Sequence, residues 1–402
     1  MKHAAYKTFL RNYYLCSSLY DLIFAYPIYN VMFHMRGMTI FQISLLLAWW
    51  AGIAMVAEIP SGALADYWSR QKLLAIAPLI KALCFVTWYF AEGNFYLFAL
   101  GFLFWGVGSS FRSGTTEALL YDHLVFFDKR HEYEKILGRK KFYFHIVLLF
   151  SSITGGFIAY YNIDWTLLLS GVPLLLSSLF AALIKDVPKT ETTGEIHYLE
   201  YIKIASQEIH TNKTLRYILI YALSISIFGD LEEFDQLYYE LVRLPIWAFG
   251  IIGSIGSGLN AVSSLYAYKL KGLPWVHYLF LLLSALFLGI VGLFPSIPII
   301  GLLLLAYVVV EPLNVLIDSR LQHSITSVSR ATITSVNNLL VCFFGIVITP
   351  LFGLVSKIWN FQAIYLSCCG WMVLLTGWVI LNRHHLRLSS HYNASLQEEL
   401  ES

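Results

Sequence analysis

The chain has 402 residues, of which 58% are hydrophobic and 13% are charged, and its formal net charge at pH 7 is +2. Soluble domains carry about 25% charged residues, and a soluble core of this size cannot hide so much apolar surface. The composition therefore excludes an ordinary soluble protein, and the near-neutral charge argues against a nucleic-acid partner. We expect lipid to solvate most of the chain.

Apolar segments long enough to cross a bilayer follow one another along the whole sequence. A membrane helix needs about 20 mostly apolar residues, and by that rule the sequence predicts an all-α membrane protein with about twelve transmembrane helices. The approximate limits of these spans are 12–35, 40–64, 73–91, 95–121, 142–161, 164–184, 214–240, 245–268, 275–294, 297–319, 332–356 and 360–381.

The spans fall into two sets of six, separated by a long polar connection. We expect an N-terminal six-helix bundle at 1–184, a cytoplasmic linker at 185–213, a C-terminal six-helix bundle at 214–382 and a cytoplasmic tail at 383–402. Two pseudo-symmetric bundles of this kind are a transporter architecture, in which the substrate site lies between the halves near the middle of the membrane.

Weak similarity between the halves supports this division. Residues 33–43 resemble 239–249, and each stretch is expected to form the outer turn between the first two spans of its half. Residues 154–162 resemble 349–360 in the same way. We therefore interpret the chain as an internal duplication.

Lysine and arginine residues predict the orientation. With a cytoplasmic N-terminus, nearly all of them lie in inner loops, and the outer side carries only Arg36, Arg243 and Lys357. The positive-inside rule favours this orientation, so both termini are expected in the cytoplasm. We expect a monomer that spans a bacterial inner (plasma) membrane many times.

Two polar motifs interrupt the apolar pattern. The first has the form Gly-x-x-x-Asp-x-x-x-Arg-x-Lys at Gly62, Asp66, Arg70 and Lys72, and it follows Glu58-Ile59-Pro60-Ser61. The second is Ser113-Gly114-Thr115-Thr116-Glu117-Ala118-Leu119-Leu120-Tyr121-Asp122. Together they resemble one branch of the major facilitator superfamily, a large class of secondary transporters. The resemblance extends over nearly the whole chain, although these two stretches carry most of it.

The resemblance implies a cytoplasmic gate. Gly62 allows two helices to pack closely, and Asp66 can cap the helix that begins near Arg330, because a helix N-terminus favours an anion. Arg70 is expected to reach the carboxylate of Asp122, so that these contacts hold the two halves together. The expected gate residues are Gly62, Asp66, Arg70, Lys72, Asp122 and Arg330.

The first motif departs from the family pattern in two places. Ser69 stands where glycine is usual, and Tyr67 stands where a basic residue is frequent. These departures predict a turn that is less tight than usual.

Ionisable residues inside the first-half spans are a second group of candidates, since each costs about 2.5–3.5 kcal/mol at bilayer depth. We expect Lys81 to pair with Glu58, and Arg112 to pair with either Asp21 or Glu117. These residues are either structural ion pairs or the charged wall of an inward cavity.

The second half is acidic within its spans. Carboxylates that crowd together in a low-dielectric surrounding hold protons more readily, so we expect proton coupling here, with Glu232, Glu233 and Asp235 as leading candidates. Asp21 and Glu311 come next. A solvated outer rim is the alternative interpretation of this cluster.

The expected function is secondary active transport of a small organic solute by alternating access, with proton antiport and efflux favoured over uptake. Arg112 and Lys81 would suit a carboxylate-bearing metabolite or siderophore, whereas aromatic residues beside acids would suit a cationic solute. A non-transporting receptor and a polytopic membrane enzyme remain alternatives. No compact catalytic set supports an enzyme, and the five cysteines form no Cys-x-x-Cys pair, so no metal or cofactor is expected.

Overall fold

The computed structural model describes residues 2–113, 115–187, 207, 209–324 and 330–386, and the regular elements in this part of the chain are helices. Eleven helical segments there are long and apolar enough to cross a membrane. The predicted all-α architecture with about twelve spans is therefore confirmed. The count differs by one because no helix of the first predicted span, 12–35, is among the eleven.

The helices form two compact units. The first comprises Met1–Thr193 and Leu244–Ser254, and the second comprises Gly194–Arg243 and Ile255–Ser402. The helix α13 (Ile246–Tyr266) thus contributes its first residues to the N-terminal unit, which the sequence did not predict.

The helices of the N-terminal unit include one short 3-10 helix between α6 and α7. They are α1 (Lys2–Asp21), α2 (Tyr29–Met35), α3 (Ile40–Tyr67), α4 (Arg70–Tyr89), α5 (Phe95–Arg112), α6 (Thr115–Phe126), η1 (Arg130–Glu132), α7 (Tyr133–Tyr161) and α8 (Ile163–Ala182).

Polar side chains at the helix starts explain several of these boundaries. Thr39 and Gln42 form a capping box at α3, in which each side chain bonds the other residue's backbone N–H. The Asn94 side chain accepts bonds from two N–H groups at the start of α5. Ser69 accepts the Lys72 backbone N–H at 3.2 Å and so begins α4. Because these N–H groups have no partner within their own helix, the caps fix where each helix begins.

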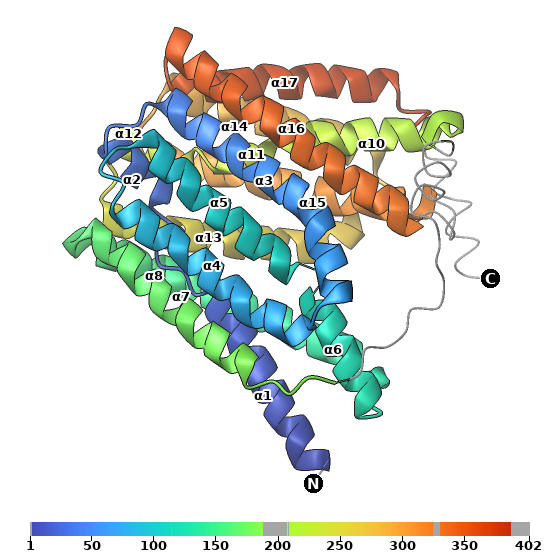
Figure 1. The fold of residues 1–402 in the computed structure, drawn as a ribbon. Helices are drawn as coiled ribbons and strands as arrows, with labels where there is room; N and C mark the ends of the chain where they lie inside the picture. The colour runs from blue at the N-terminus through green and yellow to red at the C-terminus, as the bar shows by residue number, and fades with distance from the viewer. Residues whose placement is uncertain (1, 114, 188–206, 208, 325–329, 387–402) are drawn as a thin grey trace. The chain divides into compact units, whose positions relative to one another are not determined.

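Within this unit, α4 packs between α5 and α8, and α3 packs on α5. Figure 1 shows α3, α5 and α4 side by side. The helix α1 packs against α7 and α8. Large apolar side chains such as Phe150 and Leu175 are exposed on the helix surfaces, which fits a protein that lipid solvates.

The first predicted span, 12–35, is divided between two helices. The helix α1 ends at Asp21, residues 22–28 are not helical, and α2 begins at Tyr29. Pro27 lies in this break, where it cannot donate a backbone hydrogen bond. The freed N–H groups of Phe24 and Ala25 instead donate to the buried Ser170 hydroxyl at 3.0 and 3.2 Å. A side chain on α8 therefore satisfies the broken backbone.

Two further predicted spans are also divided. The span over 95–121 contains the end of α5 at Arg112 and the start of α6 at Thr115. The span over 214–240 consists of three successive helices. In a bilayer, such breaks are tolerated where the backbone is buried in protein or lines a cavity. The broken helices are therefore candidates for lining a binding site.

The C-terminal unit contains the remaining helices. They are α10 (Lys213–Ile225), α11 (Ile227–Glu232), α12 (Asp235–Leu241), the rest of α13, η2 (Ala267–Leu270), α14 (Pro274–Leu293), η3 (Ile297–Ile299), α15 (Ile300–Ser324), α16 (Arg330–Ile358) and α17 (Gln362–Leu381). In this unit α14 packs against α15 and α17, while α16 contacts α11 and α17.

Replacing Ser170 with alanine should destabilise the protein. The substitution leaves the Phe24 and Ala25 N–H groups without their acceptor, and each such loss costs about 1–3 kcal/mol. Thermal unfolding of the purified protein in detergent measures the effect. Ser177→Ala is the matched control, because the Ser177 hydroxyl only donates to the carbonyl of Cys16 within α1. Equal melting temperatures for the two variants would contradict this account of the break.

Candidate functional site

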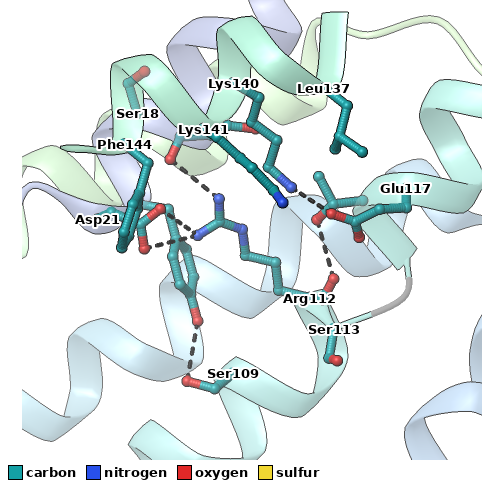
Figure 2. Close-up of a pocket in the computed structure, with 13 residues that line it drawn as sticks. Ser18, Asp21, Ser109, Arg112, Ser113, Glu117, Leu137, Lys140, Lys141 and Phe144 are labelled. Carbon is teal, nitrogen blue, oxygen red and sulfur yellow. Dashed lines mark hydrogen bonds and ion pairs between the residues drawn. The ribbon is translucent and has the colours of Figure 1, made fainter. Parts of the chain in front are cut away.

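A cavity of about 390 Å³ lies within the N-terminal unit. Its wall is formed by α1, α5, α6 and α7, and by the connection between α5 and α6 (Figure 2). The lining residues are Ser17, Ser18, Tyr20, Asp21, Ser109, Arg112, Ser113, Thr116, Glu117, Leu137, Lys140, Lys141 and Phe144. The divided helices thus border a polar and charged hollow.

Arg112 is the most highly bonded cation of the cavity. Its Nη1 donates to both carboxylate oxygens of Asp21 at 3.1 Å, and its Nη2 donates to the Ser17 carbonyl at 3.1 Å. The guanidinium carbon also lies 3.9 Å from the centre of the Tyr20 ring. Of the two partners considered from the sequence, Asp21 is the one that Arg112 contacts. The charge-assisted bonds from Nη1 to Asp21 and the bond from Nη2 to Ser17 together fix the orientation of the guanidinium group.

Glu117 forms a second ion pair on the opposite wall. Its Oε1 accepts a bond from Nζ of Lys140 at 2.5 Å. Figure 2 shows the neighbouring Lys141 extending into the cavity beside Lys140. Sequence reasoning counted both lysines only as inner-loop charges, and no signal in the sequence distinguished them from the other lysines of that loop.

Lys81 lies behind this wall and is almost completely buried. Its ammonium group donates to the Tyr26 hydroxyl at 3.1 Å and lies 4.3 Å from the centre of the Tyr20 ring. It also lies 4.8 Å from the Trp105 ring. Cation–π contacts of this kind stabilise a desolvated cation. The predicted pairing with Glu58 lies outside the described residues, because the Glu58 side chain is not among them.

Two of the predicted gate residues are in contact. Nη1 of Arg70 donates to Oδ2 of Asp122 at 2.5 Å, and the Asp122 side chain is buried. Lys72 is exposed at the start of α4. The side chains of Asp66 and Arg330, and the surroundings of Gly62, lie outside the described residues.

The acids of the C-terminal unit do not share one environment. Asp235 is buried, and its Oδ1 accepts bonds from the hydroxyls of Tyr307 at 2.8 Å and Tyr365 at 3.4 Å. Glu232 is exposed and Glu233 is half-buried. The two tyrosines come from distant parts of the chain, so the sequence offered no signal for them.

Two further carboxylates of this unit lie apart from Asp235. Glu311 accepts a bond from the Asn314 amide at 3.2 Å. Asp230 lies against α16, where a Cβ added at Gly345 would come within 2.7 Å of its Oδ1. Glycine at position 345 therefore leaves room for this carboxylate.

Comparison with known proteins identifies the family. The family model described as Major Facilitator Superfamily matches residues 14–350. No curated protein sequence matches the chain.

Solved structures with a similar fold include three transporters. A nucleoside transporter, NupG, is 14% identical with a TM-score of 0.77, over 94% of this chain and 98% of that one. A bacterial homologue of the human lysosomal transporter Spinster is 14% identical with a TM-score of 0.72, over 98% of both chains. The xylose transporter XylE from E. coli is 12% identical with a TM-score of 0.66, over 92% of this chain and 94% of that one. At these identities the likeness shows the fold alone.

The family model covers most of the chain, and the motifs at 62–72 and 113–122 lie within it. The protein belongs to the Major Facilitator Superfamily and is therefore a membrane transporter and not an enzyme.

Proposed function

We propose that this transporter exports a small organic solute by alternating access and that proton antiport drives the export. The observation that carries the proton coupling is Asp235, a carboxylate that is 5% exposed and accepts bonds from two tyrosine hydroxyls. The choice of export rests on the sequence motifs at 58–66 and 113–122.

Asp235 suits proton binding for a physical reason. Burying an ionised carboxylate is costly unless a cation or enough hydrogen bonds compensate it. Among the described side chains, Asp235 has hydroxyl donors as its partners and forms no ion pair. The protonated form avoids this cost, so a change in the surroundings of Asp235 can drive uptake or release of a proton.

The local backbone allows such a change. The segment from α10 to α12 consists of three short helices, and Asp235 is the first residue of the last one. Discontinuous helices place coupling-ion sites in many transporters. A small rearrangement between α11 and α12 would alter the distance from Asp235 to Tyr307 and Tyr365.

For the gate, we propose that Arg70 and Asp122 form the fixed part of a latch. Asp122 is 4% exposed, so removing Arg70 takes an ion-pair partner from a buried carboxylate, which is unfavourable. Asp66 is the proposed residue that joins this pair to the C-terminal bundle. We further propose that the bundles at 1–184 and 214–382 move against each other, with both termini in the cytoplasm of a bacterial cell.

Asp66→Asn and Arg70→Ala should each reduce the transport rate at least tenfold. If either substitution destabilises the state closed on the cytoplasmic side by about 1.4 kcal/mol, the equilibrium between the closed and open states shifts tenfold. Counterflow in proteoliposomes measures the rate, with a solute found by thermal-shift screening of a chemical library. Lys135→Ala, which removes an exposed cation from α7, is the control and should transport normally. Wild-type rates for the Asp66 and Arg70 variants would refute the latch.

Asp235→Asn should uncouple transport from the proton gradient. Asparagine fills the same space but exchanges no proton, so solute should still equilibrate across the membrane while a pH gradient no longer concentrates it. A pH jump across proteoliposomes tests this. Glu240→Gln neutralises another carboxylate of α12 and should keep the coupling. If the Asp235 variant still concentrates solute against its gradient, the proton assignment is wrong.

A further inference from the structure

We propose that the cavity of the N-terminal unit binds an acidic group of the transported solute, either a carboxylate or a phosphate, and that Lys141 is its first contact. This inference rests on the proposed transport function, because it names the class of solute that the transporter carries. The argument depends on the charges of the cavity wall and on how they are paired.

The cavity wall carries more cations than anions. Three cations line it, namely Arg112, Lys140 and Lys141, and two carboxylates, Asp21 and Glu117. Each carboxylate is bonded to one of the cations. Among the described residues, Lys141 forms no ion pair with either carboxylate. The wall therefore keeps one uncompensated positive charge.

The buried residues next to the cavity wall also contribute a positive electrostatic potential. Lys81 is buried beside the Tyr20 ring, and the groups that its ammonium contacts are a hydroxyl and aromatic rings, which carry no negative charge. Since a low-dielectric surrounding screens this charge poorly, Lys81 adds to the positive potential in the cavity.

An acidic solute fits this arrangement better than a cationic one. An anion can bind the Lys141 ammonium without breaking any existing contact. A cation would have to displace Arg112 from Asp21 or Lys140 from Glu117, because both carboxylates are already engaged. Repulsion between the positive charges of the cavity and a cationic solute also disfavours binding of such a solute.

The rest of the wall indicates a solute with an apolar body. Leu137 and Phe144 provide apolar surface, and Ser18 and Ser113 provide hydroxyl groups (Figure 2). The volume of about 390 Å³ lies within the roughly 300–1,000 Å³ of small-molecule sites. The cavity thus accommodates a small amphipathic acid.

A simpler explanation makes a different prediction. Lysines are enriched in the inner loops of membrane proteins, and on that basis Lys141 would be equivalent to Lys135. Lys135 lies six positions earlier on the same helix, α7, but does not line the cavity. Replacing each lysine separately distinguishes a cavity charge from a general loop charge.

The charge preference of the cavity can be measured without knowing the solute. The reporter is Ser18→Cys, in a full-length background where the exposed Cys342 and the partly exposed Cys369 are replaced by serine. The modification rates by a sulfonate-bearing and a trimethylammonium-bearing methanethiosulfonate are compared, and their ratio is normalised to that of a free small thiol.

We expect the normalised ratio to favour the anionic reagent and to fall by roughly threefold to tenfold in Lys141→Gln, as expected for loss of one nearby charge. Lys141→Arg and Lys135→Gln should leave it unchanged. A ratio that favours the cationic reagent, or equal effects of Lys141→Gln and Lys135→Gln, would overturn the proposal.

Protection of the introduced thiol distinguishes the two kinds of acid. Slower modification in the presence of citrate supports a carboxylate, and slower modification in inorganic phosphate supports a phosphate. Protection by neither, or equal protection by choline, would overturn the acidic-group assignment. If counterflow fails while the cavity still prefers the anionic reagent, the proposed transport function is refuted and the charge preference of the cavity is not. The two proposals can therefore fail separately.

Discussion

The high cost of placing a charged or polar group in an apolar bundle, which hydrogen bonds, aromatic rings or an opposite charge can reduce, governs this structure. Arg112 illustrates it, because it lies at the end of α5 and is only 11% exposed. Its bonds to Asp21 and to the Ser17 carbonyl join α5 to α1. Both helices end at these residues, so the ion pair holds together the place where the first and fourth predicted spans are divided.

The two units reduce this cost in different ways. In the N-terminal unit, cations and carboxylates pair, as in Arg70 with Asp122 and Lys140 with Glu117. In the C-terminal unit, Asp235 has tyrosine hydroxyls as partners. Paired charges give a rigid wall of fixed polarity, whereas a carboxylate without a counter-ion responds to its surroundings by binding a proton. This difference supports the proposal that the first unit recognises the solute and the second binds the proton.

Hydropathy and helix length were enough to predict an all-helical membrane protein, because both properties are local. The contact of Arg112 with Asp21 was accessible too, since the two residues lie at similar depths on neighbouring predicted spans. The break after Asp21 was missed because the apolar pattern continues across it, although Pro27 was a signal. Its stabilisation by Ser170 depends on a tertiary contact that no local pattern encodes.

The proton-coupling role of the acidic group in the second half stays a prediction, but the surroundings of its members can be compared with the sequence. Successive helical residues point about 100° apart, so its members could not all share one environment, but only the fold shows that Asp235 is the buried one. Tyr307 and Tyr365 reach it from distant segments. The sequence did not distinguish Lys141 from the other inner-loop lysines, because its position at the cavity depends on how α7 packs.

We propose that the two bundles move against each other during transport and that the pair of Arg70 with Asp122 is part of the latch between them. Pulsed electron spin resonance measures it most directly, with spin labels at Gln71 on α4 and Ser324 on α15. The account predicts two distance populations whose ratio changes with pH and shifts toward the longer distance in Arg70→Ala. A single distance that neither pH nor this substitution alters would contradict it.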